Sequence, residues 1–228
     1  MSQTALYRTG GVAMIAGAVA ALLLNLAHGR SPDATSTEAQ LRLAADRGGW
    51  TAVHLGLAVA VLMLTGGLVA VSRSLTLSPG AGWARLGMGG ALINGALFTA
   101  LMATDGVAFK RVADAWAAAP DKGALFQAGY VLRELDSALL SVWTLEFLGL
   151  TVLVYGLAIG TRSPYPAWLG PAGIVLGVAG LIDGLALGLG GLTFGAFNVL
   201  FTAVSLLATA WLLVMGVHLW RRAKTLPT

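Results

Sequence analysis

The chain has no cysteine and few charged residues among its 228 residues. The absence of cysteine excludes disulfide bonds, thiolate nucleophiles, cysteine-ligated zinc and iron–sulfur clusters. Asp, Glu, Lys and Arg make up 11% of the sequence, whereas about 25% is typical of a soluble domain. Neither a phosphate-binding glycine loop nor a dinucleotide fingerprint is present. The net charge of +4 comes without a basic cluster interleaved with aromatic residues, so nothing indicates a nucleic-acid partner.

Long apolar stretches fill most of the sequence, with 57% hydrophobic residues and a mean hydropathy of +0.80. One helical crossing of a bilayer needs roughly 20 mostly apolar residues, because every backbone amide must be hydrogen-bonded within its own segment. The six stretches that meet this requirement are 8–28, 50–71, 83–104, 123–159, 168–189 and 194–220. We therefore expect an all-α, polytopic membrane protein with a single membrane domain over 1–228. No small-x-small cleavage site follows the first stretch, so we expect it to be retained as a helix.

A short segment, 107–119, separates the third and fourth stretches. It carries Lys110, Arg111 and Asp114 among apolar residues, and Pro120 ends it. This pattern is typical of an amphipathic helix that lies on a membrane surface. The fourth stretch is longer than one crossing requires, so we expect its first, more polar part to project from the bilayer or to line a cavity.

The distribution of charge predicts the orientation of the helices. The side that holds both termini has seven Lys and Arg residues and no acidic residue, whereas the other side has seven basic and eight acidic residues. The basic residues near the termini lie in short turns beside helix ends, where the positive-inside rule is strongest. We therefore expect a multi-pass protein of the cell (inner, plasma) membrane, with both termini in the cytoplasm and the lipid bilayer as its partner.

Two carboxylates lie inside apolar stretches, Glu146 in the fourth and Asp183 in the fifth. An acidic group near mid-bilayer is costly unless it is protonated, paired or hydrated, so such residues indicate functional sites. Both lie roughly 20–25 Å from the turn that joins their helices, at 1.5 Å of rise per residue. Adjacent antiparallel helices would bring the two carboxyl groups to the same level.

Further polar residues gather in the half of the membrane away from the termini. Several of them fall on one face of the fourth stretch when it is plotted at about 100° per residue. A polar stripe on a membrane helix is expected to face the bundle interior or water. The residues of this candidate pocket, which opens away from the cytoplasm, are Glu146, Asp183, His54, Glu134, Tyr130, Gln127, Ser141 and Asn25.

Each of these residues also has a structural interpretation. Asn25, His28 and Asp105 end helices, where polar side chains meet water and unpaired backbone groups. His54 fits a neutral, hydrogen-bonded histidine of the interior. Glu146 and Asp183 remain the hardest to explain by structure alone, although hydrogen bonding between helices would account for them.

No metal or cofactor is predicted from the spacing of the residues. His28, His54, Glu146 and Asp183 are of the types that bind zinc or iron, but no HExxH-like spacing joins them. His54 and His218 lie on opposite sides of the membrane in this topology, so they make a poor pair of haem ligands. No lysine lies within an apolar helix, which argues against a retinal protein.

Three functions remain open. The first is the binding or movement of a small or lipid-like molecule in the outward-facing pocket, with coupling to protons as one version. The second is a membrane enzyme on a lipid or isoprenoid substrate, with Glu146 and Asp183 as general acid and base. The third is a structural or assembly subunit, in which the glycines at four-residue spacing in 168–189 contact a membrane partner or a second copy of the chain.

The opening RTGGVAMIAGAVAALLLNLAHG and the later PAWLGPAGIVLGVAGLIDGLALGLGG, followed by RRAK, are glycine-rich apolar patterns. In these parts, about half of the chain, the sequence resembles a large bacterial and archaeal family of uncharacterised six-helix membrane proteins. The resemblance implies six helices with both termini on one side. It implies no activity and no catalytic residues.

Overall fold

The computed structural model describes residues 2–28, 35–190 and 194–225, and of 194–198 only the backbone. The described residues form helices and no strand. In chain order the elements are α1 (Gln3–His28), α2 (Thr37–Asp46), α3 (Trp50–Ser74), α4 (Ala81–Ala103), η1 (Thr104–Phe109), α5 (Lys110–Ala118), α6 (Gly123–Trp143), η2 (Thr144–Thr151), α7 (Val152–Gly160), α8 (Leu169–Gly188) and α9 (Phe194–Ala223). Six helices are long and apolar enough to cross a membrane, which confirms the predicted number.

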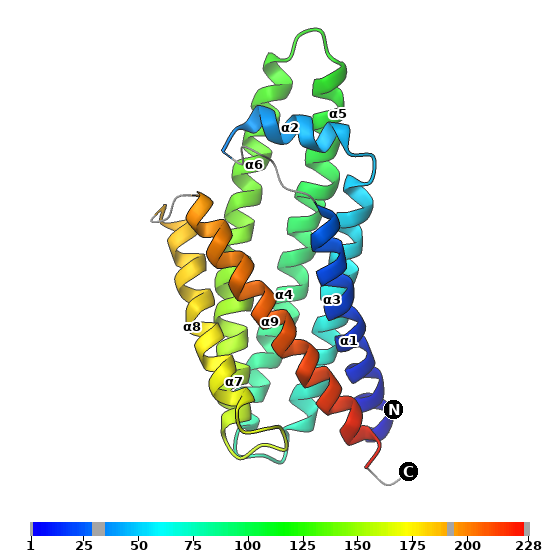
Figure 1. Cartoon of the computed structure of the whole chain (residues 1–228), viewed down its shortest axis with the longest axis vertical. Helices are drawn as coiled ribbons and strands as arrows, with labels where there is room; N and C mark the ends of the chain where they lie inside the picture. The colour runs from blue at the N-terminus through cyan, green and yellow to red at the C-terminus, as the bar shows by residue number, and fades with distance from the viewer. Residues whose placement is uncertain (1, 29–34, 191–193, 226–228) are drawn as a thin grey trace.

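The long helices stand side by side in one bundle (Figure 1), with both termini at the same end. α1 packs against α3 and α9, α3 packs against α4, and α8 packs against α7, η2 and α9. Apolar side chains such as Met14, Leu68 and Met215 fill the interior and are fully buried. The predicted stretch 83–104 is part of a longer helical rod, Ala81–Ala118, whereas the predicted stretch 123–159 coincides with the rod Gly123–Gly160 to within one residue. Each rod has 38 residues.

Both of these rods contain a π-helical stretch. In η1 (Thr104–Phe109) and η2 (Thr144–Thr151) the backbone bonds reach from residue i to i+5, which widens the helix and shifts the side chains that follow. The segment expected as a separate surface helix, 107–119, therefore continues the rod of α4 as the end of η1 and α5. Whether it touches a membrane surface stays a prediction.

A headpiece extends the bundle at the end opposite the termini. It consists of α2, α5 and the first half of α6, and α2 lies across the other two in Figure 1. The headpiece has an apolar core of its own, separate from that of the bundle, which contains Leu41, Ala44, Trp50, Phe109, Ala113 and Trp116. The polar first part of the fourth predicted stretch thus belongs to this extension.

The glycine ridge of α8 is covered by the chain itself. A methyl group on Gly177 would meet the backbone of Leu153, one on Gly180 the backbone of Leu148, and one on Gly184 the backbone of Leu145. One of the three functions left open by the sequence uses this ridge to contact a membrane partner or a second copy, and that contact stays a prediction. In the structure, the ridge allows close packing of α8 on η2 and α7, because small residues let helix backbones approach each other.

Candidate metal centre

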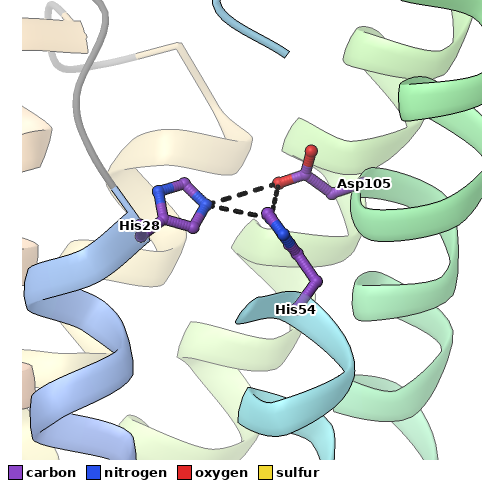
Figure 2. Close-up of side chains that lie close together, drawn as sticks. All are labelled: His28, His54 and Asp105. Carbon is purple, nitrogen blue, oxygen red and sulfur yellow. Dashed lines mark hydrogen bonds and ion pairs between the residues drawn. The ribbon is translucent and has the colours of Figure 1, made fainter. Parts of the chain in front are cut away.

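Three side chains from three different helices meet where the headpiece joins the bundle (Figure 2). His28 is the last residue of α1, His54 lies in the second turn of α3, and Asp105 lies in η1. The Nε2 atom of His54 lies 2.9 Å from the Nε2 atom of His28 and 2.9 Å from Oδ2 of Asp105. Oδ2 of Asp105 lies 3.8 Å from Nε2 of His28. The three atoms form a small triangle, and each of them can donate a lone pair to a metal ion.

The size of this triangle suits a single metal ion. Two ligand atoms bound to Zn²⁺ at about 2.0–2.1 Å in a tetrahedron lie about 3.3–3.4 Å from each other. The three observed separations, 2.9, 2.9 and 3.8 Å, fall on both sides of that value. Only small movements of the side chains are therefore needed to place all three atoms around one ion.

The π-helical turn η1 places Asp105 beside His54. Gly106 packs against His54 so tightly that a Cβ atom at this position would collide with the Cβ atom of the histidine. Side chains of α3 donate to two carbonyls of this turn: Trp50 Nε1 donates to the carbonyl of Asp105 (3.0 Å) and Thr51 Oγ1 to that of Gly106 (2.7 Å). These bonds fix η1 against α3.

A hydrogen bond on the far side of the His54 ring fixes the tautomer of this histidine. It leaves Nε2, the nitrogen that faces the cluster, as an acceptor. Nδ1 of His54 lies 2.7 Å from the carbonyl oxygen of Trp50, which can only accept, so Nδ1 carries the proton. Metal-bound histidines have this arrangement, in which the second ring nitrogen donates to a carbonyl or carboxylate. The indole of Trp50 also lies beside both imidazoles, with ring centroids 4.7 Å from His54 and 5.2 Å from His28.

The contacts among the three side chains need a cation. With its proton on Nδ1, a neutral His54 presents a lone pair at Nε2, and so does the carboxylate of Asp105. A proton on Nε2 of His28 can satisfy the contact with His54, but the contact between His54 and Asp105 would still join two lone pairs. A metal ion, an additional proton on His54 or a proton on the Asp105 carboxyl resolves this conflict. His54 is fully buried, which makes an unpaired lone pair there costly.

A further carboxylate, Asp136, lies near the cluster on α6. α6 packs against η1, and the carboxylates of Asp136 and Asp105 interact electrostatically. The Oδ1 atom of Asp136 is buried and has no hydrogen-bond partner among the described residues. When Asp136 is ionised, its charge adds to that of Asp105 and makes this end of the bundle attractive to a cation, because two like charges close together disfavour each other without one.

A pocket of about 250 Å³ opens beside the two histidines. Its walls come from the end of α1, the start of α3 and the short connection before α3, and they comprise Ala27, His28, Arg47, Gly48, Gly49, Trp50, Val53 and His54. Asp105 is not among these residues. The pocket therefore reaches the cluster from the side of the imidazoles, and Asp105 lies outside its wall.

The two deep carboxyl groups that the sequence singled out are not joined to each other. Oε1 of Glu146 accepts a hydrogen bond from Thr151 within η2 (2.7 Å), next to Gly90 of α4. Asp183 lies on α8, is fully buried, and has no hydrogen-bond partner among the described residues for either carboxyl oxygen. Their roles as pocket residues or as acid and base stay predictions.

The remaining predicted pocket residues occupy different places. Ser141 is buried and donates to the carbonyl of Gly184 (2.9 Å), which ties α6 to α8. Tyr130 and Glu134 are exposed beside Arg133, which pairs with Glu134 at 2.8 Å. The predicted residues that lie on the surface without joining the cluster also include Gln127 and Asn25. Of the eight residues predicted, His54 is the one in the cluster.

From the sequence alone, Asp105 and His28 are expected at helix ends that meet water. His28 and His54 are also of the types that bind zinc or iron, but no spacing joins Asp105 to them. One signal was present, because His28, His54 and Asp105 all lie near helix ends on the same side of the predicted bundle. What the sequence lacks is the order of the helices around the bundle, which decides which ends face each other. Compared with models of known protein families, with curated proteins and with solved structures, this chain matches none of them.

Proposed function

We propose that this protein is a membrane metalloprotein that binds a divalent transition-metal ion through His28, His54 and Asp105. The observation that carries the proposal is the convergence of three lone-pair atoms on one point, with the proton of His54 held on the opposite side of its ring. Two imidazoles and one carboxylate form the ligand set of many zinc hydrolases and non-haem iron enzymes. Such sites leave at least one coordination position for a further ligand.

The type of ion follows from the chemistry of the ligands. Imidazole nitrogen favours Zn²⁺, Fe²⁺, Co²⁺ and related ions, whereas Mg²⁺ and Ca²⁺ prefer oxygen ligands. With two nitrogen ligands and one oxygen ligand, the site selects the first group. The pocket beside the imidazoles gives a small or lipid-like molecule access to the open coordination position.

We expect the site to lie at the edge of the bilayer, because of its position along the helices. Asp105 follows Ala81 by a helical distance of about 36 Å at 1.5 Å per residue, compared with a hydrocarbon core of about 30 Å. The termini lie at the opposite end of the bundle. If both termini lie in the cytoplasm, as the basic turns near them predict, the metal centre would face the outside of the cell membrane.

The test is metal analysis of the purified full-length protein in mild detergent. The protein is stripped with a chelator, incubated with Zn²⁺ or Co²⁺, and separated from free ions before the bound metal is measured by mass spectrometry. We expect close to one ion per chain for the native sequence. The variants His54→Gln and Asp105→Asn are expected to lose binding by at least about tenfold, since each removes a ligand.

The control is His218→Gln, which removes a histidine near the C-terminal end of α9, away from the cluster. It is expected to leave the metal content unchanged. Failure of the native protein to bind either ion would overturn the proposal and favour a protonated His54 paired with Asp105. Equal binding by all variants would assign the metal to another place.

A further inference from the structure

We infer that the pocket binds a small oxyanion, a carboxylate or phosphate group, between the bound metal ion and the guanidinium of Arg47. This inference rests on the proposed function, because the metal supplies one of the two contacts. It adds the chemical class of the ligand. The supporting observations are the composition of the pocket wall, the hydrogen bonds of Arg47 and the direction from which the pocket reaches the histidines.

Arg47 is held in place by one of its three guanidinium nitrogens. Nη1 donates to the carbonyls of Ala27 and His28, each at 3.1 Å, at the C-terminal end of α1. Among the described residues, Nε and Nη2 donate no further hydrogen bond. The two carbonyls thus position the guanidinium beside a metal ligand while two nitrogens keep their donors. An arginine fork of this kind matches the two oxygens of a carboxylate or phosphate.

The charge of the pocket wall favours an anion. Among the described lining residues, Arg47 is the only Asp, Glu, Lys or Arg side chain, and the two histidines bring the metal ion to the same wall. The carboxylate that partly neutralises the ion, Asp105, lies outside the lining. An oxyanion that entered would therefore meet positive charge on two sides, and none of the described lining residues is acidic.

The rest of the wall limits what can be attached to the oxyanion. Ala27, Val53 and the indole of Trp50 are apolar, and Gly48 and Gly49 have no atom within 4 Å of where a side chain would begin. A volume of about 250 Å³ holds a small anion or the head of an amphiphile. A free anion and the headgroup of a lipid would make the same contact with the metal ion. The experiment therefore compares the binding of the two.

The experiment uses the full-length protein loaded with Co²⁺, whose visible absorption responds to a change in its ligands. Inorganic phosphate and acetate are added as free anions. Oleoyl lysophosphatidic acid is the amphiphile with a phosphate headgroup, and mono-oleoylglycerol is its counterpart without charge. We expect the anions to change the spectrum in a saturable way and mono-oleoylglycerol to leave it unchanged. Tighter binding of lysophosphatidic acid than of phosphate would identify the lipid headgroup as the source, and equal binding the free anion.

The variant Arg47→Ala tests the role of the guanidinium. Loss of a charge-assisted pair is expected to weaken phosphate binding by about 10- to 100-fold. Arg47→Lys keeps the charge without the fork and is expected to retain part of the affinity. The control is Arg42→Ala, which removes an exposed arginine that pairs with Glu38 and lies outside this pocket. In each variant the Co²⁺ spectrum without anion must match the native one, which shows that the metal site is intact.

The outcomes distinguish the inference from the proposed function beneath it. If the native protein takes up no Co²⁺, the proposed metal centre fails. If Co²⁺ binds but no anion changes its spectrum, or if Arg47→Ala and Arg47→Lys bind phosphate as well as the native protein, the metal centre stands and the oxyanion site is overturned. An Arg42→Ala variant as impaired as Arg47→Ala would also overturn it, since the effect would then come from net charge.

Discussion

Gly106 of η1 packs directly against the Cβ atom of His54 and leaves no room for a side chain between them. This contact joins two segments that lie far apart in the sequence and sets the distance between the imidazole and Asp105. A larger residue would force η1 away from α3, and with it the carboxylate. The hydrogen bonds from Trp50 and Thr51 to the carbonyls of η1 would lengthen at the same time.

Gly106→Ala is therefore expected to lower stability and to weaken metal binding together. Forcing a methyl group into this contact should cost about 1–3 kcal/mol. The measurements are the midpoint of thermal unfolding in detergent and the affinity for Co²⁺. The matched control is Gly66→Ala in α3, where no atom lies within 4 Å of the added methyl group, and where alanine favours the helix. A Gly106→Ala variant as stable as Gly66→Ala would contradict the close contact.

Metal binding is expected to raise the midpoint of thermal unfolding, because the ion would connect α1, α3 and η1. A ligand that binds only the folded state at 100 times its dissociation constant stabilises it by about 2.7 kcal/mol. The measurement is a thermal scan of stripped protein with increasing Zn²⁺. His54→Gln should abolish the increase, whereas His218→Gln should keep it. An equal increase in both variants would show that Zn²⁺ acts elsewhere.

Asp136→Asn is expected to weaken metal binding without abolishing it. The carboxylate interacts with Asp105 but is not one of the three converging ligands, so its charge contributes attraction for the ion from a distance. We expect a loss of affinity for Co²⁺ of several-fold, about 1 kcal/mol on the scale of charge interactions in a partly buried site. Glu134→Gln is the control, since Glu134 is exposed and paired with Arg133. Equal affinities in the two variants would remove Asp136 from the site.

Asn94 is a fully buried side chain that connects three helices at the centre of the bundle. Its amide donates to Thr65 of α3 (3.2 Å), and its carbonyl accepts from the indole of Trp143 on α6 (2.7 Å). Asn94→Ala should destabilise the protein by about 1–3 kcal/mol, because Trp143 and Thr65 lose their partner in an apolar interior. In an Asn94→Ala, Trp143→Phe double-mutant cycle, the two losses should be less than additive. Strict additivity would show that the bond contributes nothing.

The protein is expected to lose stability as the pH rises from about 10 to about 12. Ser74 uses its proton to donate to the carbonyl of Val71, so the Tyr165 hydroxyl must donate to Ser74 (2.8 Å). Burial raises the pKa of Tyr165 to about 12 from an ordinary value of 10. Between these values the unfolded chain has released the proton and the folded protein still holds it, so stability falls with rising pH. Tyr165→Phe should make thermal stability fall less steeply over this range, and an unchanged slope would contradict the assignment.

Hydropathy was sufficient to predict the six long apolar helices, since six described helices meet the length and composition of a membrane span. It was less able to place their ends. The third stretch was expected to end at 104, yet the rod continues through η1 and α5 to Ala118. Hydropathy identifies only the apolar part of a helix. The helix itself extends further wherever the residues favour helix and their side chains are solvated or packed.

The site was only partly predictable for a related reason. The sequence gives the depth of a residue along its helix, and at that level Glu146 and Asp183 looked like partners. It does not give the direction in which each helix turns its side chains. Glu146 bonds within its own rod, and Asp183 lies on a different helix without a bond to it. Trp50 is buried beside the two histidines.

The π-helical turn that holds Asp105 depends on one additional residue in the chain. Such a turn contains one residue more than an α-helix needs for the same rise, so deleting one residue from 104–109 would restore an unbroken α-helix. Side chains on the two sides of the deletion would then change their relative direction by about 100°. Either Asp105 would turn away from the histidines or α5 would lose its packing in the headpiece. A single codon thus separates this arrangement from an uninterrupted α-helix. Related chains of similar composition can be divided into those that have the additional residue of η1 and those that lack it.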